Sequence, residues 1–140
     1  MNRFLCFVTI LLTLASCGPR ERNANQVQGL PDIWPDYVGV TVPATIAPLD
    51  FTLPDADALD VRVTAPDGTS LRSSGTSATR FSEKGWKSLL KRSAGDSLTV
   101  TVSGLFAGTW RRYEPFRIFV SDDEIDYGLT YRLIEPGYQI

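Results

Sequence analysis

The sequence predicts a mainly β domain, built as an antiparallel two-sheet sandwich with one short helix. Two observations indicate this fold. Seven or eight short segments have the alternating or β-branched composition of strands and are separated by turn residues, and a single segment has helical spacing. Because a short strand buries only alternate side chains, two facing sheets are needed to enclose a core. The alternative is an α+β open sheet with the helix laid across it.

The strands expected in the first half are short and are interrupted by prolines. Residues 31–36 should be extended, since each proline disfavours helix in the residue before it. Residues 37–42 predict a first strand, which Pro43 and Pro48 place at the border of a sheet. Residues 49–53 predict a second strand.

The alternation at residues 59–65 predicts a third strand, whose valines face inward while Asp60 and Arg62 face outward. Pro-Asp-Gly at residues 66–68 supplies the turn of a hairpin. A return strand, a loop and a further short strand should follow, at residues 69–72, 73–77 and 78–81.

Residues 82–94 predict the helix. Ser82 can act as its N-cap, and Glu83 suits the positive end of the helix dipole. Apolar residues at positions 86, 89 and 90 share one face, and the basic residues lie elsewhere around the helix. Gly95 can end the helix in a left-handed conformation.

The strongest strand pattern is at residues 96–103, and residues 106–113 extend the pairing. Later strands are expected at residues 116–120 and 129–134. This number of strands is typical of an immunoglobulin-like (Ig-like) sandwich. Its predicted core contains Val61, Val63, Leu98, Val100, Val102, Phe116 and Ile118.

The chain begins with a positively charged start and a twelve-residue apolar run at residues 4–15. A spanning helix needs ~20 apolar residues, so this run fits the core of a secretory signal instead. The sequence Leu-Ala-Ser-Cys at residues 14–17 resembles the lipobox of bacterial lipoproteins. The resemblance implies cleavage before Cys17, a diacylglycerol thioether on its sulfur, and acylation by chains such as palmitate. The alternative is an ordinary cleaved signal with a chance cysteine.

Three segments follow from this reading: a signal peptide at residues 1–16, a lipidated cysteine and flexible tether at 17–29, and one β-rich domain at 30–140. Residues 18–28 are polar and carry almost no apolar side chains, which predicts the tether. The tether has no acidic run of the kind that routes some lipoproteins to the cell surface. It also has no aspartate next to Cys17 that would retain the protein at the inner membrane. The expected location is therefore the outer membrane, facing the periplasm, with surface exposure as the alternative.

The side-chain inventory argues against an enzyme. The chain has no histidine, which excludes histidine-based catalytic triads and histidine-ligated metals. Removal of the signal with Arg3 and Cys6 leaves thirteen basic against sixteen acidic residues, near −3, and only Cys17 as a thiol. We therefore expect no cofactor, no disulfide and no nucleic-acid partner. The acidic run at residues 122–126 lacks the glycine and glutamate spacing of a calcium loop, so a solvated turn is expected.

Two clusters resemble the N-terminal region of large bacterial lipoproteins that continue into a TolB-like β-propeller. One is Ile-Trp-Pro-Asp-Tyr at residues 33–37 with the valines and prolines that follow to residue 51. The other is Glu-Pro-Phe-Arg-Ile-Phe-Val at residues 114–120 with residues 125–138. In that family the second cluster leads into the propeller, so this chain is expected to be either a fragment or a module that stands alone. The resemblance implies no catalytic residues.

Large aromatic residues are the remaining binding candidates. A sugar-stacking platform could be formed by Trp34, Trp110, Tyr113 and Tyr138, together with Trp86 of the helix, although large aromatics more often lie in cores or interfaces. We therefore expect a lipid-anchored, non-enzymatic interaction or structural module of the cell envelope. Its partner is expected near the chain termini, as a following propeller or another envelope protein. The alternative is a carbohydrate-binding β-sandwich.

Overall fold

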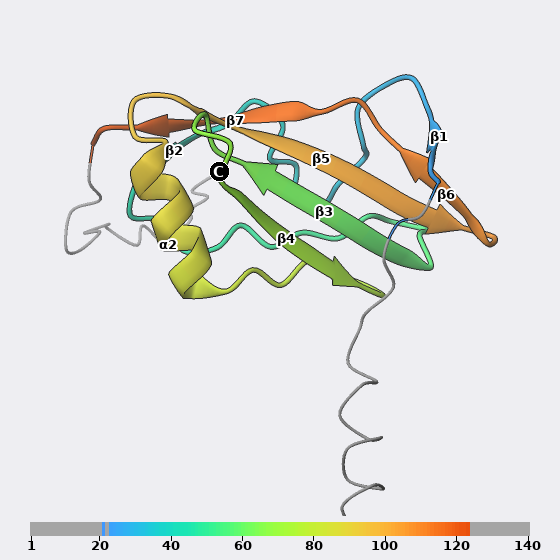
Figure 1. Cartoon of the computed structure of the whole chain (residues 1–140). Helices are drawn as coiled ribbons and strands as arrows, with labels where there is room; N and C mark the ends of the chain where they lie inside the picture. Colours follow the sequence, from blue (N-terminus) through green and yellow to red (C-terminus); the bar gives the residue numbers. More distant parts are fainter. Residues whose placement is uncertain (1–20, 22, 124–140) are drawn as a thin grey trace, which may run out of the picture.

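The computed structural model describes residue 21 and residues 23–123 (Figure 1). The expected signal peptide, Cys17, Tyr138 and the strand expected at residues 129–134 lie outside these described residues. The described part contains β1 (Asn25–Gln26), β2 (Thr41–Pro43), β3 (Ala58–Thr64), β4 (Ser70–Gly75), α2 (Glu83–Arg92), β5 (Ser97–Phe106), β6 (Thr109–Arg112) and β7 (Phe116–Ser121).

The strands form one mixed sheet with the long strand β5 at its centre. On one side of β5 lies β3, followed by β4. On the other side, β7 pairs with the first half of β5 and β6 with its second half. The pairs β1–β6 and β2–β7 are parallel, and the other pairs are antiparallel.

The prediction of a mainly β fold with one helix is confirmed, whereas the Ig-like sandwich of two antiparallel sheets is not. A second sheet would have needed strands from the segments expected at residues 49–53 and 78–81. These segments contribute only isolated bridges, from Thr52 to Trp34 and from Thr52 to Ala78. Prolines in this part of the chain remove backbone donors, which limits the pairing that it can make.

One face of the sheet forms the core. The register sets Val61 beside Val102 and Val63 beside Val100 on this face. All seven residues predicted for the core are at most 4% exposed. The predicted phase of these strands is therefore confirmed, because a shift by one residue would have turned every valine to the other face.

Helix α2 covers one end of the core face. Ser82 caps it by accepting a hydrogen bond from the Gly85 N–H, as predicted. Gly95 takes the expected positive φ, 73°, two residues after the C-cap, and its N–H donates to the carbonyl oxygen of Val120. The turn after the helix is thereby attached to β7. The buried residues of the helix are Trp86, Leu89 and Leu90.

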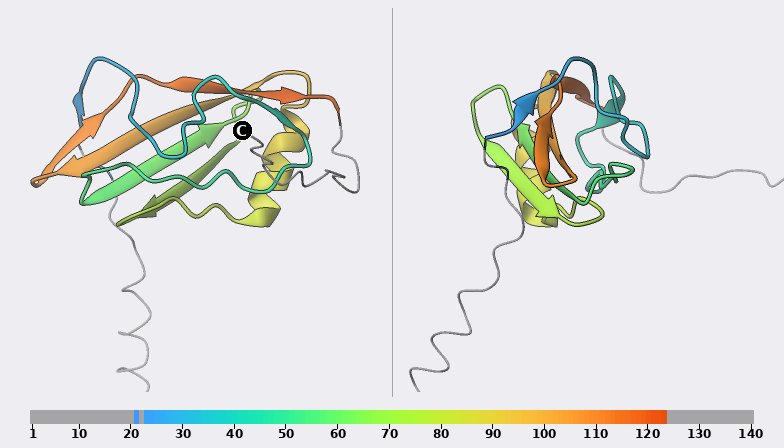
Figure 2. Two further views of the ribbon diagram at one scale, coloured as in Figure 1. Left: turned by 180° about the vertical axis from the view of Figure 1, so that it is seen from behind. Right: turned by 90° about the vertical axis from the view of Figure 1, so that its right-hand side faces the viewer.

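Apart from β2, the segment at residues 30–57 is irregular and covers the rest of the core face (Figure 2). Outside β2 it contributes four buried apolar side chains, Ile33, Leu49, Phe51 and Leu53. The molecule thus has two layers, a sheet and a cover made of this segment and α2. We call the opposite face of the sheet the outer face. It is the face to which Asp60, Arg62, Arg72, Thr101, Ser103 and Arg112 point.

Candidate functional site

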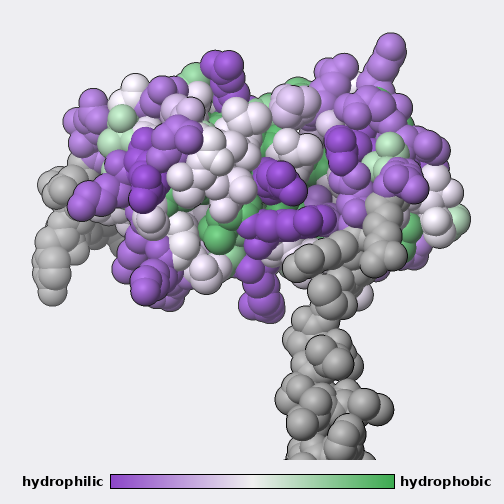
Figure 3. All heavy atoms as spheres, in the orientation of Figure 1, coloured by the Kyte–Doolittle hydropathy of each residue, from purple (hydrophilic) through white to green (hydrophobic). Residues whose placement is uncertain are grey.

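The outer face holds a polar hollow of about 360 Å³. Strand alternation places every second residue of four neighbouring strands on this face. The register sets Arg62 opposite both Arg72 and Thr101, and it sets Ser103 opposite both Asp60 and Arg112. These six side chains line the hollow together with Glu21, which comes from outside the sheet. In the space-filling view, hydrophilic residues spread over much of the surface turned toward the reader (Figure 3).

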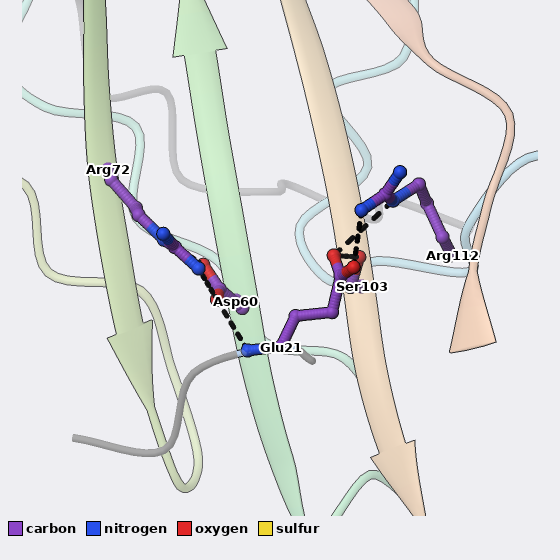
Figure 4. A network of polar contacts seen from close by, with 5 residues as sticks. All are labelled: Glu21, Asp60, Arg72, Ser103 and Arg112. Carbon is purple, nitrogen blue, oxygen red and sulfur yellow. Dashed lines mark hydrogen bonds and ion pairs between the residues drawn. The ribbon is translucent and has the colours of Figure 1, made fainter. Parts of the chain in front are cut away.

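Glu21 attaches the N-terminal segment to this hollow (Figure 4). Its backbone N–H donates to Oδ2 of Asp60 at 2.8 Å. Its carboxylate accepts a hydrogen bond from Oγ of Ser103 at 2.6 Å and pairs with the guanidinium of Arg112. The side chain of Glu21 is only 13% exposed as a result. Glu21 therefore connects strands β3, β5 and β6 at one point.

Residues 17–29 were expected to form a flexible tether, but their described part makes hydrogen bonds to the domain. In the described part of that stretch, β1 pairs with β6, and the N–H of Val27 donates to the carbonyl oxygen of Arg112 at 2.9 Å. This part of the stretch therefore lies against the domain. Composition predicted a tether because polar residues rarely form a core, but here they bind through backbone and carboxylate hydrogen bonds.

Asp60 and Arg72 form the second ion pair of the hollow. Nε of Arg72 donates to Oδ1 of Asp60 at 2.7 Å, and a terminal nitrogen of Arg72 donates to Oδ2. This two-point geometry matches the planar guanidinium to the carboxylate and is the strong form of such a pair. The Asp60 side chain is 4% exposed and that of Arg72 35% exposed. Asp60 faces outward on β3, as the alternation predicts, but its partners bury it.

The surroundings of Glu21 favour its charged form. Burial alone would raise the pKa of Glu21, but hydrogen bonds from Ser103 and Arg112 and the charge of Arg112 outweigh it, so the pKa is lowered. Neighbouring Asp60 opposes this effect by like-charge repulsion. Glu21 is therefore an ionised ligand of Arg112 and is poorly suited to act as a general acid or base near neutral pH.

Arg62 is the third guanidinium of the hollow. It makes no ion pair with any residue in the described part of the chain, and it is exposed. Its neighbours across the strands are the Arg72 side chain and the Thr101 hydroxyl. A planar guanidinium beside a hydroxyl offers several donors to an oxyanion such as a carboxylate or phosphate. Among the described residues no group of three or more Asp, Glu, His or Cys is placed to hold a metal ion.

The aromatic candidates do not come together in one platform. Trp34 is 70% exposed and belongs to the covering layer, where it pairs with Thr52. Trp110 lies on β6, two residues from Arg112 and therefore on the outer face. Tyr113 is partly buried and packs against the core. Tyr138 and the lipidation candidate Cys17 lie outside the described residues.

The sequence analysis did not predict the five residues of the ionic network: Glu21, Asp60, Arg72, Ser103 and Arg112. The alternation on β3 did predict that Asp60 faces outward, because the apolar residues on either side of it face the core. The partners could not be found in this way, since they come from other strands and from Glu21, 39 positions away in sequence.

Comparisons with known proteins identify no relative of this chain. No protein-family model matches the chain, and searches of curated proteins and of solved structures find no match. Within the described range, no helix has the length and apolar character needed to cross a membrane. The resemblance to propeller-bearing lipoproteins remains a hypothesis that rests on the sequence clusters alone.

Proposed function

We propose that this protein is a lipid-anchored component of the bacterial cell envelope, with an outer-membrane, periplasm-facing location. It acts there as a non-enzymatic binding module, and the polar hollow of the outer face is its binding surface. The observation that carries the proposal is the docking of Glu21 in that hollow, only four positions after the lipidation candidate Cys17. Anchor and binding surface are thereby connected by a short stretch of chain.

The length of this connection limits where the domain can lie. Four residues of extended chain span at most ~14 Å. An acylated Cys17 inserted in a bilayer would therefore keep the hollow within about that distance of the headgroup region. Two or three acyl chains would make the attachment nearly permanent, because each buried methylene contributes ~0.8 kcal/mol.

The chemistry of the hollow supports binding in preference to catalysis. Its charged groups are two arginine–carboxylate pairs and one further guanidinium, all suited to holding anions or dipoles. The lowered pKa of Glu21 moves that group away from the range useful for proton transfer at neutral pH. By the sequence resemblance, such a module would precede a TolB-like propeller or bind another envelope protein.

A carbohydrate-binding function is the second candidate, and the position of Trp110 favours it. Its indole ring shares the outer face with the Arg112 guanidinium two residues along β6. Stacking on an aromatic ring together with hydrogen bonds to charged side chains is a common way to hold a sugar. Soluble glycan fragments that bind the wild-type protein and not Trp110→Ala would favour this candidate.

Lipidation is tested by expressing the full chain and measuring the mass of the mature protein. We expect a chain that begins at Cys17 and carries acyl groups. Cys17→Ser should leave an unprocessed precursor without acyl groups, whereas Cys6→Ser, in the leader, should be processed normally. A wild-type protein that is cleaved but carries no lipid would contradict the proposal.

A further inference from the structure

We propose that the outer face binds the phosphate groups of anionic phospholipids, with Arg62 as the principal contact. The inference deepens the proposed function, since it takes the anchoring at Cys17 as its starting point. In this proposal the ligand of the hollow is the bilayer itself, so that the acyl chains on Cys17 and the outer face both bind the membrane.

The charge of the outer face differs in sign from that of the whole chain. The chain as a whole has a formal net charge of −2. On the outer face, however, the described strand residues include four arginines, at positions 62, 72, 112 and 117, and a single carboxylate, Asp60. Docked Glu21 adds one more negative charge, which leaves this face with an excess of two positive charges. An acidic protein that keeps one basic face is suited to an anionic surface.

The position of Glu21 limits the distance between the hollow and Cys17. Glu21 lies in the hollow, and Cys17 is four residues before it in the sequence. Four residues of extended chain span at most ~14 Å. A lipidated Cys17 would therefore hold the outer face, where Glu21 is bound, close to the headgroups.

The three arginines of the hollow differ in their surroundings. Arg72 and Arg112 are already bound by Asp60 and Glu21, which fixes their guanidinium groups in place. Arg62 has no such carboxylate among the described residues and stands between Arg72 and Thr101. A phosphate at Arg62 could thus accept hydrogen bonds from the guanidinium of Arg62 and from the Thr101 hydroxyl. The volume of the hollow is within the ~300–1,000 Å³ range of small-ligand sites.

The experiment measures binding to vesicles without the help of an acyl chain. It uses residues 17–140 with Cys17→Ser, which keeps every residue that the structure describes. Vesicles of phosphatidylcholine alone are compared with vesicles that also contain phosphatidylglycerol. We expect binding only to the mixed vesicles, weakening as salt is added. Arg62→Gln should lower the affinity about fivefold, the change expected for removing one arginine near an anionic surface.

Lys87→Gln is the matched control, because it removes one exposed basic residue from the helix and leaves the outer face intact. Circular dichroism of both variants checks that they remain folded. Equal binding to both vesicle types, or an equal loss with Lys87→Gln, would overturn the inference. So would binding of inorganic phosphate at Arg62 without binding to the mixed vesicles. Failure of lipidation at Cys17 would appear separately, in the mass of the mature protein.

Discussion

Glu21 and Asp60 are bound to each other although both carry carboxylates. The backbone N–H of Glu21 donates to Oδ2 of Asp60 at 2.8 Å, while each carboxylate has its own arginine. This arrangement lets two acidic residues lie side by side, because Arg72 and Arg112 neutralise them from opposite sides. The N-terminal segment is thus held by the sheet through a buried aspartate that Arg72 binds at two points.

Asp60→Asn should destabilise the protein by about 2 kcal/mol, the usual cost of losing hydrogen bonds to a charged, largely buried group. The figure stays below that of a fully buried ion pair because Arg72 remains 35% exposed to water. Urea unfolding measures the change. Asp67→Asn is the control, since the Asp67–Arg92 pair is exposed on both sides, is screened by water and should contribute much less to stability. Equal effects of the two substitutions would contradict the assigned role of Asp60.

Glu21 predicts a dependence of stability on pH. Its pKa is lower in the folded protein than the ordinary value of 4.5, so the folded state binds the proton less readily than the unfolded state. The resulting stabilisation is fully present above pH 4.5 and is lost as the pH falls through the folded pKa. The free-energy difference between wild type and Glu21→Gln should therefore be constant near neutral pH and shrink below pH 4.5. A difference that stays constant through acid pH would show that the charge of Glu21 has no part in docking.

Val100→Ala tests the core face. Val100 is fully buried, and the register sets it between Val63 and Phe116. Loss of two methyl groups and the cavity left behind should cost about 2 kcal/mol in unfolding free energy. Thr99→Ala, on the exposed face of the same strand, should change it by less than ~0.5 kcal/mol. Similar losses at the two positions would mean that the faces of β5 are assigned wrongly.

Val100 and Asp60 show which features of the structure could be predicted from the sequence and which could not. Alternation along one strand predicts which face each side chain takes, and for the valines of β3 and β5 this was enough to identify the core. It also turned Asp60 outward correctly. It could not predict that Asp60 would be buried, because burial there depends on the register with β4 and β5 and on Glu21, which is distant in sequence. The same limit explains the unconfirmed sandwich: short extended segments were visible, but their pairing partners were not.

Trp34 tests the expected partner surface near the N-terminal side of the domain. Its side chain is 70% exposed, so it contributes little to the stability of the domain itself. We expect a partner protein to cover it. In the processing proposed above, Cys6 is removed and Cys17 is lipidated, so a cysteine placed at position 34 would be the only free thiol and could be labelled selectively. Trp34→Cys should react with a maleimide slowly in intact envelopes and quickly in the purified protein.

Lys87→Cys is the control for that experiment, because this exposed helix position lies on a different element and should react at the same rate in both settings. Trp34→Ala should leave the unfolding free energy within ~0.5 kcal/mol of wild type, as expected for an exposed side chain. Trp86→Ala removes a buried ring that stacks on Phe81 and should cost about 3–5 kcal/mol. The slow labelling at position 34 would then report on a covering partner and not on a disturbed fold. If position 34 reacts as fast in the envelope as in the purified protein, no partner covers Trp34, and the interaction surface must be sought on the outer face.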